Sequence, residues 1–400
     1  MLDKNQLKSI VKIQNNYIEK NLIIPFDSKE NGQKKGSGVF INNKGYILTA
    51  AHVIENAIKI WIRIPTEDSK IYIGDIVSVF SHFDIAIIRI KDYKNKNYLK
   101  IGNSDVINLR DKVYNIGFPL VAKNPIISSG SVSGFVEVDG NYFIQCDTVT
   151  NAGCSGGPVI NKKNEIIGIT SATIGKSEGS GLIIPSNIIK LHLKNMLTGK
   201  NNLLYRYSLG FSAVNTNDSM LDLIECNTSG QLVTHILKNS PVYKKISPGD
   251  IISNITIGKK KYNIDNYGLV FVPWSIGKIN YGHLLDRVTP NKNITIQYFD
   301  SKFKKNKKIT TKMLPINKIQ YTYERFYPLN TFKNGIDYLL YAGMVFMPLT
   351  INHFEYDEFK SLLPFLFENK IIWDKMIVIN YIFPISKASE KEDFHDCTIL

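Results

Sequence analysis

Short apolar runs separated by polar turns cover most of the first 185 residues of the chain. Residues 36–41 and 46–51 are two such runs, with a polar turn at 42–45 between them. Apolar runs of about four to eight residues bounded by turn residues are typical of buried β-strands. Further upstream, residues 7–24 alternate between apolar and polar and predict a first strand around 10–13, whereas the polar residues 25–35 indicate a loop. The pattern therefore predicts a mainly β domain.

The periodicity changes after residue 185. Residues 186–197 repeat apolar side chains at helical spacing, and Ser186 is a candidate N-cap for this helix. We expect the helix to close the first domain. Residues 198–207 read Thr-Gly-Lys-Asn-Asn-Leu-Leu-Tyr-Arg-Tyr, and we interpret them as a linker.

A glycine-rich string at residues 153–158 reads Gly-Cys-Ser-Gly-Gly-Pro. Glycines allow a tight turn in which backbone N–H groups converge on one point and stabilise negative charge on a carbonyl oxygen. We therefore predict Ser155 as a nucleophile. The stretch Gly153, Cys154 and Ser155 is predicted as the oxyanion hole, with the N–H groups of Gly153 and Ser155 as donors. A plain glycine-rich β-turn is the alternative interpretation.

A base and an acid precede this serine in the chain. His52 follows the run Thr-Ala-Ala, and Asp84 leads into the apolar run 85–88. His, Asp and Ser in this order form one of the arrangements in which a catalytic triad recurs, with the acid orienting the imidazole. The spacing suits two small β-barrels with His52, Asp84 and Ser155 in the cleft between them.

Four strings together resemble the HtrA/Deg family of trypsin-fold serine proteases. They are G-S-G-V-F from residue 36, L-T-A-A-H-V from 48, D-I-A-I-I from 84 and N-A-G-C-S-G-G-P-V from 151. The chain departs from the family at Cys154, where the family usually has Asn or Asp. A cysteine nucleophile is therefore an alternative, but the register before Gly156 and Gly157 favours Ser155, with Cys154 as a packed residue.

The resemblance implies a two-barrel trypsin-like serine protease domain over residues 1–200. It implies that a strand at Thr170, Ser171 and Ala172 pairs with the substrate and lines its pocket, and that a loop over 117–128 borders the site. The pocket strand carries no acidic residue, so a small or medium aliphatic side chain is expected before the cleaved bond. Family members usually assemble as trimers or multiples of trimers, and we expect a homo-oligomer.

Residues 201–318 resemble a PDZ domain, which captures an extended peptide as an added strand. Leu209, Gly210 and Phe211 match its carboxylate-binding loop, residues 239–241 match a helix start, and residues 281–288 match the helix beside the groove. A small β-rich domain without a ligand is the alternative.

Residues 319–400 resemble a partial or shortened second PDZ-like α+β region. Strands are expected there at 341–350 and 376–383. This places the chain closest to the plant and fungal Deg subgroup.

Composition limits the possible partners. Apolar residues make up 44% of the chain, enough for real cores, and no run is long enough to span a membrane. Four cysteines without metal spacing and the absence of a signal-like start predict an intracellular protein, cytoplasmic or nuclear, without metal or cofactor. The net charge of +14 includes lysine clusters at 259–261 and 302–308. No nucleic-acid motif accompanies them, so we interpret them as solvated hairpins.

Two classes of function remain after this comparison. The first is an ATP-independent serine endopeptidase that cleaves unfolded or tagged proteins. The second is a catalytically silent peptide-binding or chaperone-like protein on the same fold.

Overall fold

The computed structural model of the chain describes most of its 400 residues. The described residues are 6–21, 24–65, 67, 70–119, 122–173, 181–200, 202–319, 338–350, 353–354, 356–360, 377–391 and 398–399. Cys397 lies outside them. Contacts between Cα atoms group the chain into two compact units. The first comprises residues 1–13, 35–53 and 62–319, and the second comprises 14–34, 54–61 and 320–400.

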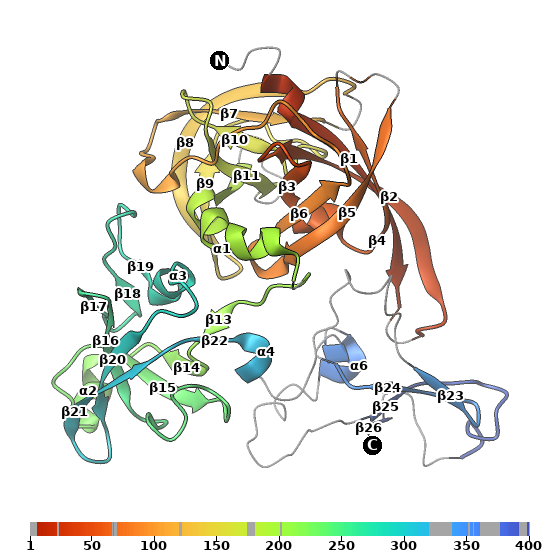
Figure 1. Ribbon diagram of the computed structural model, residues 1–400. Coiled ribbons are helices and arrows are strands. Elements are labelled where there is room, and N and C mark those ends of the chain that lie inside the picture. The colour runs from red at the N-terminus through yellow and green to blue at the C-terminus, as the bar shows by residue number, and fades with distance from the viewer. Residues whose placement is uncertain are drawn as a thin grey trace. The chain divides into compact units, whose positions relative to one another are not determined.

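The first six strands close into a barrel, drawn in red to orange in Figure 1. Strand order around this barrel is β1-β2-β3-β6-β5-β4, so β3 and β6 are neighbours although two strands separate them in the sequence. These strands are β1 (Ile10–Lys20), β2 (Ser28–Phe40), β3 (Tyr46–Ala50), β4 (Ala57–Arg63), β5 (Ile71–Phe80) and β6 (Ile85–Ile90).

The next six strands close into a second barrel with the order β10-β11-β12-β9-β8-β7. The mainly β fold with two barrels is therefore confirmed. These strands are β7 (Lys112–Gly117), β8 (Ile126–Val138), β9 (Asn141–Cys146), β10 (Pro158–Ile160), β11 (Ile166–Thr173) and β12 (Gly181–Pro185).

One apolar core joins the two barrels to the helix α1 (Ser186–Thr198). Leu48 of the first barrel, Ile169 of the second and Ile189 of the helix are each buried and belong to this cluster. Apolar residues from both barrels are thus buried together against one helix. The helix begins at Ser186 and its N-cap is Pro185, so Ser186 is not the N-cap as predicted. The Ser186 hydroxyl instead donates to the Gly102 carbonyl at 2.9 Å.

A separate apolar core organises residues 207–319. A sheet of order β14-β15-β16-β20-β21, with β17 beside β16, packs with the helix α3 (Tyr281–Asp286) around this core. Residues 239–241 begin a series of turns and no helix, which corrects that expectation. The remaining elements of the region are β13 (Tyr207–Ser208), β14 (Phe211–Val214), α2 (Asp218–Leu223), β15 (Gln231–Ile236), β16 (Ile251–Ile257), β17 (Lys260–Asn263), β18 (Leu269–Val270), β19 (Ile279–Asn280), β20 (Ile294–Asp300), β21 (Lys305–Thr311), β22 (Leu314–Pro315) and α4 (Ile316–Ile319).

The C-terminal part of the second unit contains a four-stranded sheet of order β23-β24-β25-β26. The predicted strand at 341–350 is two strands joined by a tight turn, because Ala342 and Gly343 both take left-handed φ values. Phe26 of the same unit stacks on Phe383, with ring centroids 5.3 Å apart. The elements are β23 (Leu339–Tyr341), β24 (Met344–Pro348), α6 (Asp357–Lys360), β25 (Ile377–Ile382) and β26 (Thr398–Ile399).

The expectation of a loop over residues 25–35 is wrong from residue 28 onward. β2 begins at Ser28 and neighbours β1, with Gly32 directly against the ring of Tyr17. Lys34 places its Nζ 5.0 Å from the centroid of the same ring. Backbone hydrogen bonds between two neighbouring strands do not require apolar side chains, so the polar sequence did not indicate a strand here.

His192 of α1 provides a test of this core. Its imidazole is buried between Phe80 and Phe83, and burial lowers its pKa to about 4, although the Asp286 charge acts in the opposite direction. A folded-state pKa below the unfolded value means that stability is present above about pH 6.5 and is lost as pH falls toward 4. We expect His192→Leu to flatten the pH dependence of the unfolding free energy between these limits, measured by urea denaturation.

The matched control is Ile189→Val on the same helix. It should lower the unfolding free energy by about 0.5–1.5 kcal/mol at every pH, because no ionisable group changes. An unaltered slope in His192→Leu would contradict the burial argument.

Candidate active site

The pairing of β3 with β6 brings His52 and Asp84 together. Ala50 of β3 lies opposite Ile85 of β6 in an antiparallel register, so the residues just beyond each strand end are neighbours. His52 lies in the short 3₁₀ turn η2 (Ala51–Ile54), and Asp84 immediately precedes β6. The Ala51 N–H donates to the Asp84 carbonyl at 3.0 Å and continues the pairing of the strands.

Two hydrogen bonds orient the histidine on the acid. The His52 backbone N–H donates to Asp84 Oδ1 at 2.9 Å, and His52 Nδ1 lies 2.8 Å from Asp84 Oδ2. An ionised carboxylate can only accept, so Nδ1 carries the proton and Nε2 is the basic nitrogen. The geometry is that of a base held in one tautomer by an acid.

Ser155 lies in the turn between β9 and β10. Its hydroxyl donates to the Ser171 carbonyl at 3.1 Å, and the Ser171 hydroxyl in turn donates to Asp84 Oδ2. Ser171 therefore links Ser155 to the His52–Asp84 pair. The sequence predicted Ser171 only as a pocket residue, and no pattern signal indicated its contact with Asp84.

The backbone of the Ser155 turn is held by β11. The Gly156 N–H donates to the Thr170 carbonyl at 2.7 Å, and the Thr170 N–H donates to the Gly157 carbonyl at 2.9 Å. The Thr170 hydroxyl donates to Asn115 Oδ1 at 2.9 Å. Thr170 thus supports the turn, and its predicted role in lining the substrate pocket stays a prediction. Ala172 lies in β11, and its side chain is outside the described atoms.

The three predicted oxyanion residues differ in what their N–H groups do. The Cys154 N–H donates to the Asn151 carbonyl at 3.0 Å, so it is not available to a ligand. Within the described part of the chain, the N–H groups of Gly153 and Ser155 donate to no other residue. The candidate hole is therefore formed by these two donors, without Cys154.

The Cys154 thiol is buried, and burial raises its pKa despite a weaker opposing hydrogen bond to Asn151. A protonated buried thiol is a poor nucleophile. The geometry therefore favours Ser155 over Cys154 as the reactive group.

The predicted carboxylate loop at Leu209, Gly210 and Phe211 precedes and begins the edge strand β14. Leu209 is buried, and Gly210 takes a left-handed φ of 70°. The Gly210 N–H donates to the Ser208 hydroxyl at 3.0 Å, and Ile319 packs directly over this glycine. Gly210 is thus already hydrogen-bonded, and binding of a peptide carboxylate at this loop stays a prediction.

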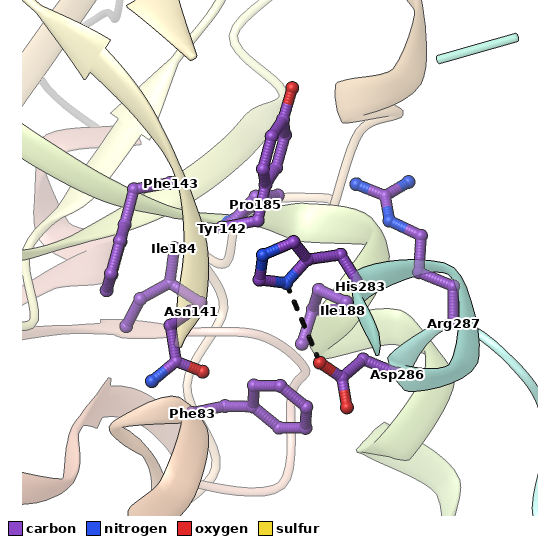
Figure 2. A pocket seen from close by; sticks show the side chains of 10 residues that line it. All are labelled: Phe83, Asn141, Tyr142, Phe143, Ile184, Pro185, Ile188, His283, Asp286 and Arg287. Atoms are coloured by element: carbon purple, nitrogen blue, oxygen red, sulfur yellow. Dashed lines mark ion pairs between the residues drawn. The ribbon is translucent and has the colours of Figure 1, made fainter. Parts of the chain in front are cut away.

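A small cavity lies where β9 and α1 meet α3, next to Phe83 and away from Ser155. Figure 2 shows His283 and Asp286 of α3 directed toward one another beside Arg287. Burial alone would lower the pKa of His283, but the Asp286 and Glu137 carboxylates outweigh it and raise the pKa. Asp286 is also bound by Arg206 and His283 forms an ion pair with Glu137, whereas the buried Asn141 Oδ1 makes no hydrogen bond with any described residue. Among the described residues, no cluster of three or more His, Cys, Asp or Glu side chains could hold a metal ion.

Comparison with known proteins supports the trypsin-like fold that carries these residues. Residues 36–169 match the family model of the trypsin-like peptidase domain. The probable serine protease do-like of Buchnera aphidicola (subsp. Acyrthosiphon pisum) is 34% identical over 239 residues, which cover 57% of this chain and 49% of the relative. The periplasmic serine endoprotease DegP of Escherichia coli K12 is 30% identical over 273 residues, covering 66% and 56% of the two chains.

The chain is similar to the HtrA/Deg proteases with the trypsin fold. A plant relative, the putative protease Do-like 13 of Arabidopsis thaliana, is 26% identical over 87% of this chain and 70% of its own length. The solved structure of the HtrA-type protease AlgW with a decapeptide has a TM-score of 0.58 and 22% identity, and the match covers 78% of this chain and 97% of that one. The chain spans about half the length of the first curated relatives it matches.

We expect Cys154→Ala to keep most of its proteolytic activity, because a buried, protonated thiol takes no part in attack on the substrate. The initial rate of peptide hydrolysis should stay within about threefold of wild type, whereas Ser155→Ala should lose activity. Cys146→Ala is the matched control, since burial raises the pKa of that thiol to about 12 and it lies in β9. Loss of activity in Cys154→Ala alone would identify a cysteine protease.

Proposed function

We propose that this chain is an ATP-independent serine endopeptidase of the HtrA/Deg type that cleaves unfolded or tagged proteins. The observation that carries the proposal is the pair of hydrogen bonds from His52 to Asp84, linked through Ser171 to Ser155. A histidine with a purely structural role does not need an acid that holds its Nδ1 beside a serine in a glycine-rich turn.

The chemistry follows from these positions. The Ser155 hydroxyl turns from the Ser171 carbonyl to His52, whose Nε2 accepts its proton while Oγ attacks the scissile carbonyl. The N–H groups of Gly153 and Ser155 bind the resulting oxyanion. His52 then protonates the leaving amine, and a water molecule releases the acyl group by the reverse sequence of proton transfers. Asp84 stabilises the imidazolium that forms at each step.

The names of relatives suggest the rest of the proposal. AlgW was solved with a decapeptide, and we propose that residues 201–318 form a PDZ domain that receives an extended peptide at the edge strand β14. We propose that residues 319–400 form an incomplete second PDZ-like domain, and that residues near 170–172 select a small or medium aliphatic side chain.

The location of the protein remains a prediction. Several relatives are named periplasmic, which does not favour the intracellular location expected from the sequence. Among the helices that the structure describes, none has the length and apolar character required to cross a membrane.

Ser155→Ala should reduce casein digestion by roughly 10⁴–10⁶-fold, because the nucleophile and base act as a unit. Its thermal unfolding temperature should match that of wild type, since the hydroxyl makes one partly exposed hydrogen bond. Reaction with a fluorophosphonate probe separates this proposal from the catalytically silent alternative: wild type should label at Ser155, and Ser155→Ala should not. Equal digestion by both proteins would exclude Ser155 as the nucleophile.

Oligomeric state provides an independent test of the proposed homo-oligomer. Multi-angle light scattering at micromolar concentration should give a mass that is three times the chain mass of 45.4 kDa, or a multiple of that trimer. A fully active monomer would contradict the proposal.

A further inference from the structure

Ser37 of β2 is completely buried, and each of its polar groups has a partner near the Ser155 turn. Its N–H donates to the Ser155 carbonyl at 2.8 Å, and its hydroxyl donates to the Gly153 carbonyl at 2.7 Å. The same hydroxyl oxygen accepts the Phe118 N–H at 2.9 Å. Its carbonyl accepts the Thr49 hydroxyl at 2.7 Å. Ser37 of the first barrel thus forms hydrogen bonds with the backbone on both sides of Cys154.

The hydroxyl proton of Ser37 has a defined direction. Because the Phe118 N–H occupies one lone pair of Oγ, the proton is left to donate to the Gly153 carbonyl. Phe118 follows β7 of the second barrel, so Oγ is positioned by that barrel while its backbone belongs to the first.

The peptide between Gly153 and Cys154 is held at both edges. Its carbonyl accepts from Ser37, and its N–H donates to the Asn151 carbonyl at 3.0 Å. A planar peptide cannot rotate without losing both bonds. The space around it is also closed, because a Cβ on Gly117 would lie 2.9 Å from Cys154 Cα and 3.0 Å from Ser37 Oγ.

The next peptide is held as well. The Cys154 carbonyl accepts the Gly157 N–H at 2.9 Å. Since the carbonyl and N–H of one peptide point in opposite directions, the Ser155 N–H faces away from Gly157. The orientation of this donor is therefore determined by the turn itself.

The donor at Gly153 is held differently. Its N–H belongs to the peptide with Ala152, and in the described part of the chain neither group of that peptide has a hydrogen-bond partner. Gly153 takes a φ of 98°, a conformation that glycine leaves easily in either direction. On the other side of this pivot, the Gly153–Cys154 peptide is held by Asn151 at its N–H and by the hydroxyl of Ser37 at its carbonyl.

We propose that Ser37 is a positioning residue for the oxyanion hole, acting through its hydroxyl on the Gly153 carbonyl. This inference rests on the proposed protease function. Removing the hydroxyl leaves a buried carbonyl without a donor, and rotation about Gly153 then turns the N–H away from the oxyanion. The nucleophile and base stay in place, because the Ser37 N–H still holds the Ser155 carbonyl.

The test compares Ser37→Ala with Ser186→Ala. Both serines are fully buried, and both donate their hydroxyl to a glycine carbonyl, at 2.7 and 2.9 Å respectively. Ser186 bonds to Gly102 at the start of α1 and takes no part in the site. On a peptide p-nitroanilide cleaved by wild type, Ser37→Ala should lose about 10–100-fold in kcat with KM changed less than about threefold. Ser186→Ala should keep the wild-type kcat.

A peptide boronic acid gives a second readout, because its tetrahedral adduct with Ser155 places an oxygen in the hole. Its affinity for Ser37→Ala should fall by about the same factor as kcat/KM, since both report binding of the tetrahedral state. Rates are expressed per Ser155 labelled to completion with fluorophosphonate, which removes any unfolded fraction from the comparison. Ser37→Gly, which also lacks the hydroxyl, should behave like Ser37→Ala.

An unchanged kcat in Ser37→Ala, an equal loss in Ser186→Ala, or a lost kcat with unchanged boronate affinity would each overturn the assignment. A wild-type protein that hydrolyses no peptide would instead count against the proposed function. The role of Ser37 would then be judged on boronate affinity alone.

Discussion

The antiparallel register of β3 and β6 is the constraint on which the site depends. Successive residues of both strands are buried, so the pairing is enclosed on both faces of the sheet. Because Ala50 lies opposite Ile85, this register places His52 next to Asp84. Asp84 adopts a left-handed φ of 54°, an uncommon conformation that its backbone bonds to Ala51 and Ser81 maintain.

The Ser155 turn depends on contacts from both barrels. β11 holds Gly156 and Gly157 from one side, and the Gly36–Ser37 segment of β2 lies against it from the other. A Cβ on Gly156 would lie 2.2 Å from the Thr49 hydroxyl. The glycine is therefore required by the close approach of β3 as well as by its φ of 78°. His52, Asp84 and Ser155 therefore come together only when both barrels are complete.

Residues 207–319 have a core of their own, yet their helix α3 uses charged groups outside that core. Arg206 makes two hydrogen bonds to the buried Asp286, at 2.7 and 2.9 Å, which neutralise a carboxylate that would otherwise be costly to bury. Arg287 forms an ion pair with Asp105, and its Cζ lies 3.6 Å from the centroid of the Trp274 ring. Helix α3 is thus held by ion pairs and a cation–π contact from several directions, which limits how far it can move.

The sequence by itself was sufficient for the mainly β class and the two barrels, because buried strands and glycine turns leave local patterns. It also pointed to His52, Asp84 and Ser155 as candidates, and the structure brings these three residues together. The sequence predicted a loop over residues 25–35 and therefore missed the first part of β2, which begins at Ser28, because a polar strand has no apolar pattern. Only the tertiary structure shows that Thr170 supports the Ser155 turn and that Ser171 contacts Asp84. It likewise shows that the Ser37 hydroxyl donates to the Gly153 carbonyl. Each of these roles is a hydrogen bond between residues far apart in the chain, and its donor and acceptor become neighbours only after the barrels close.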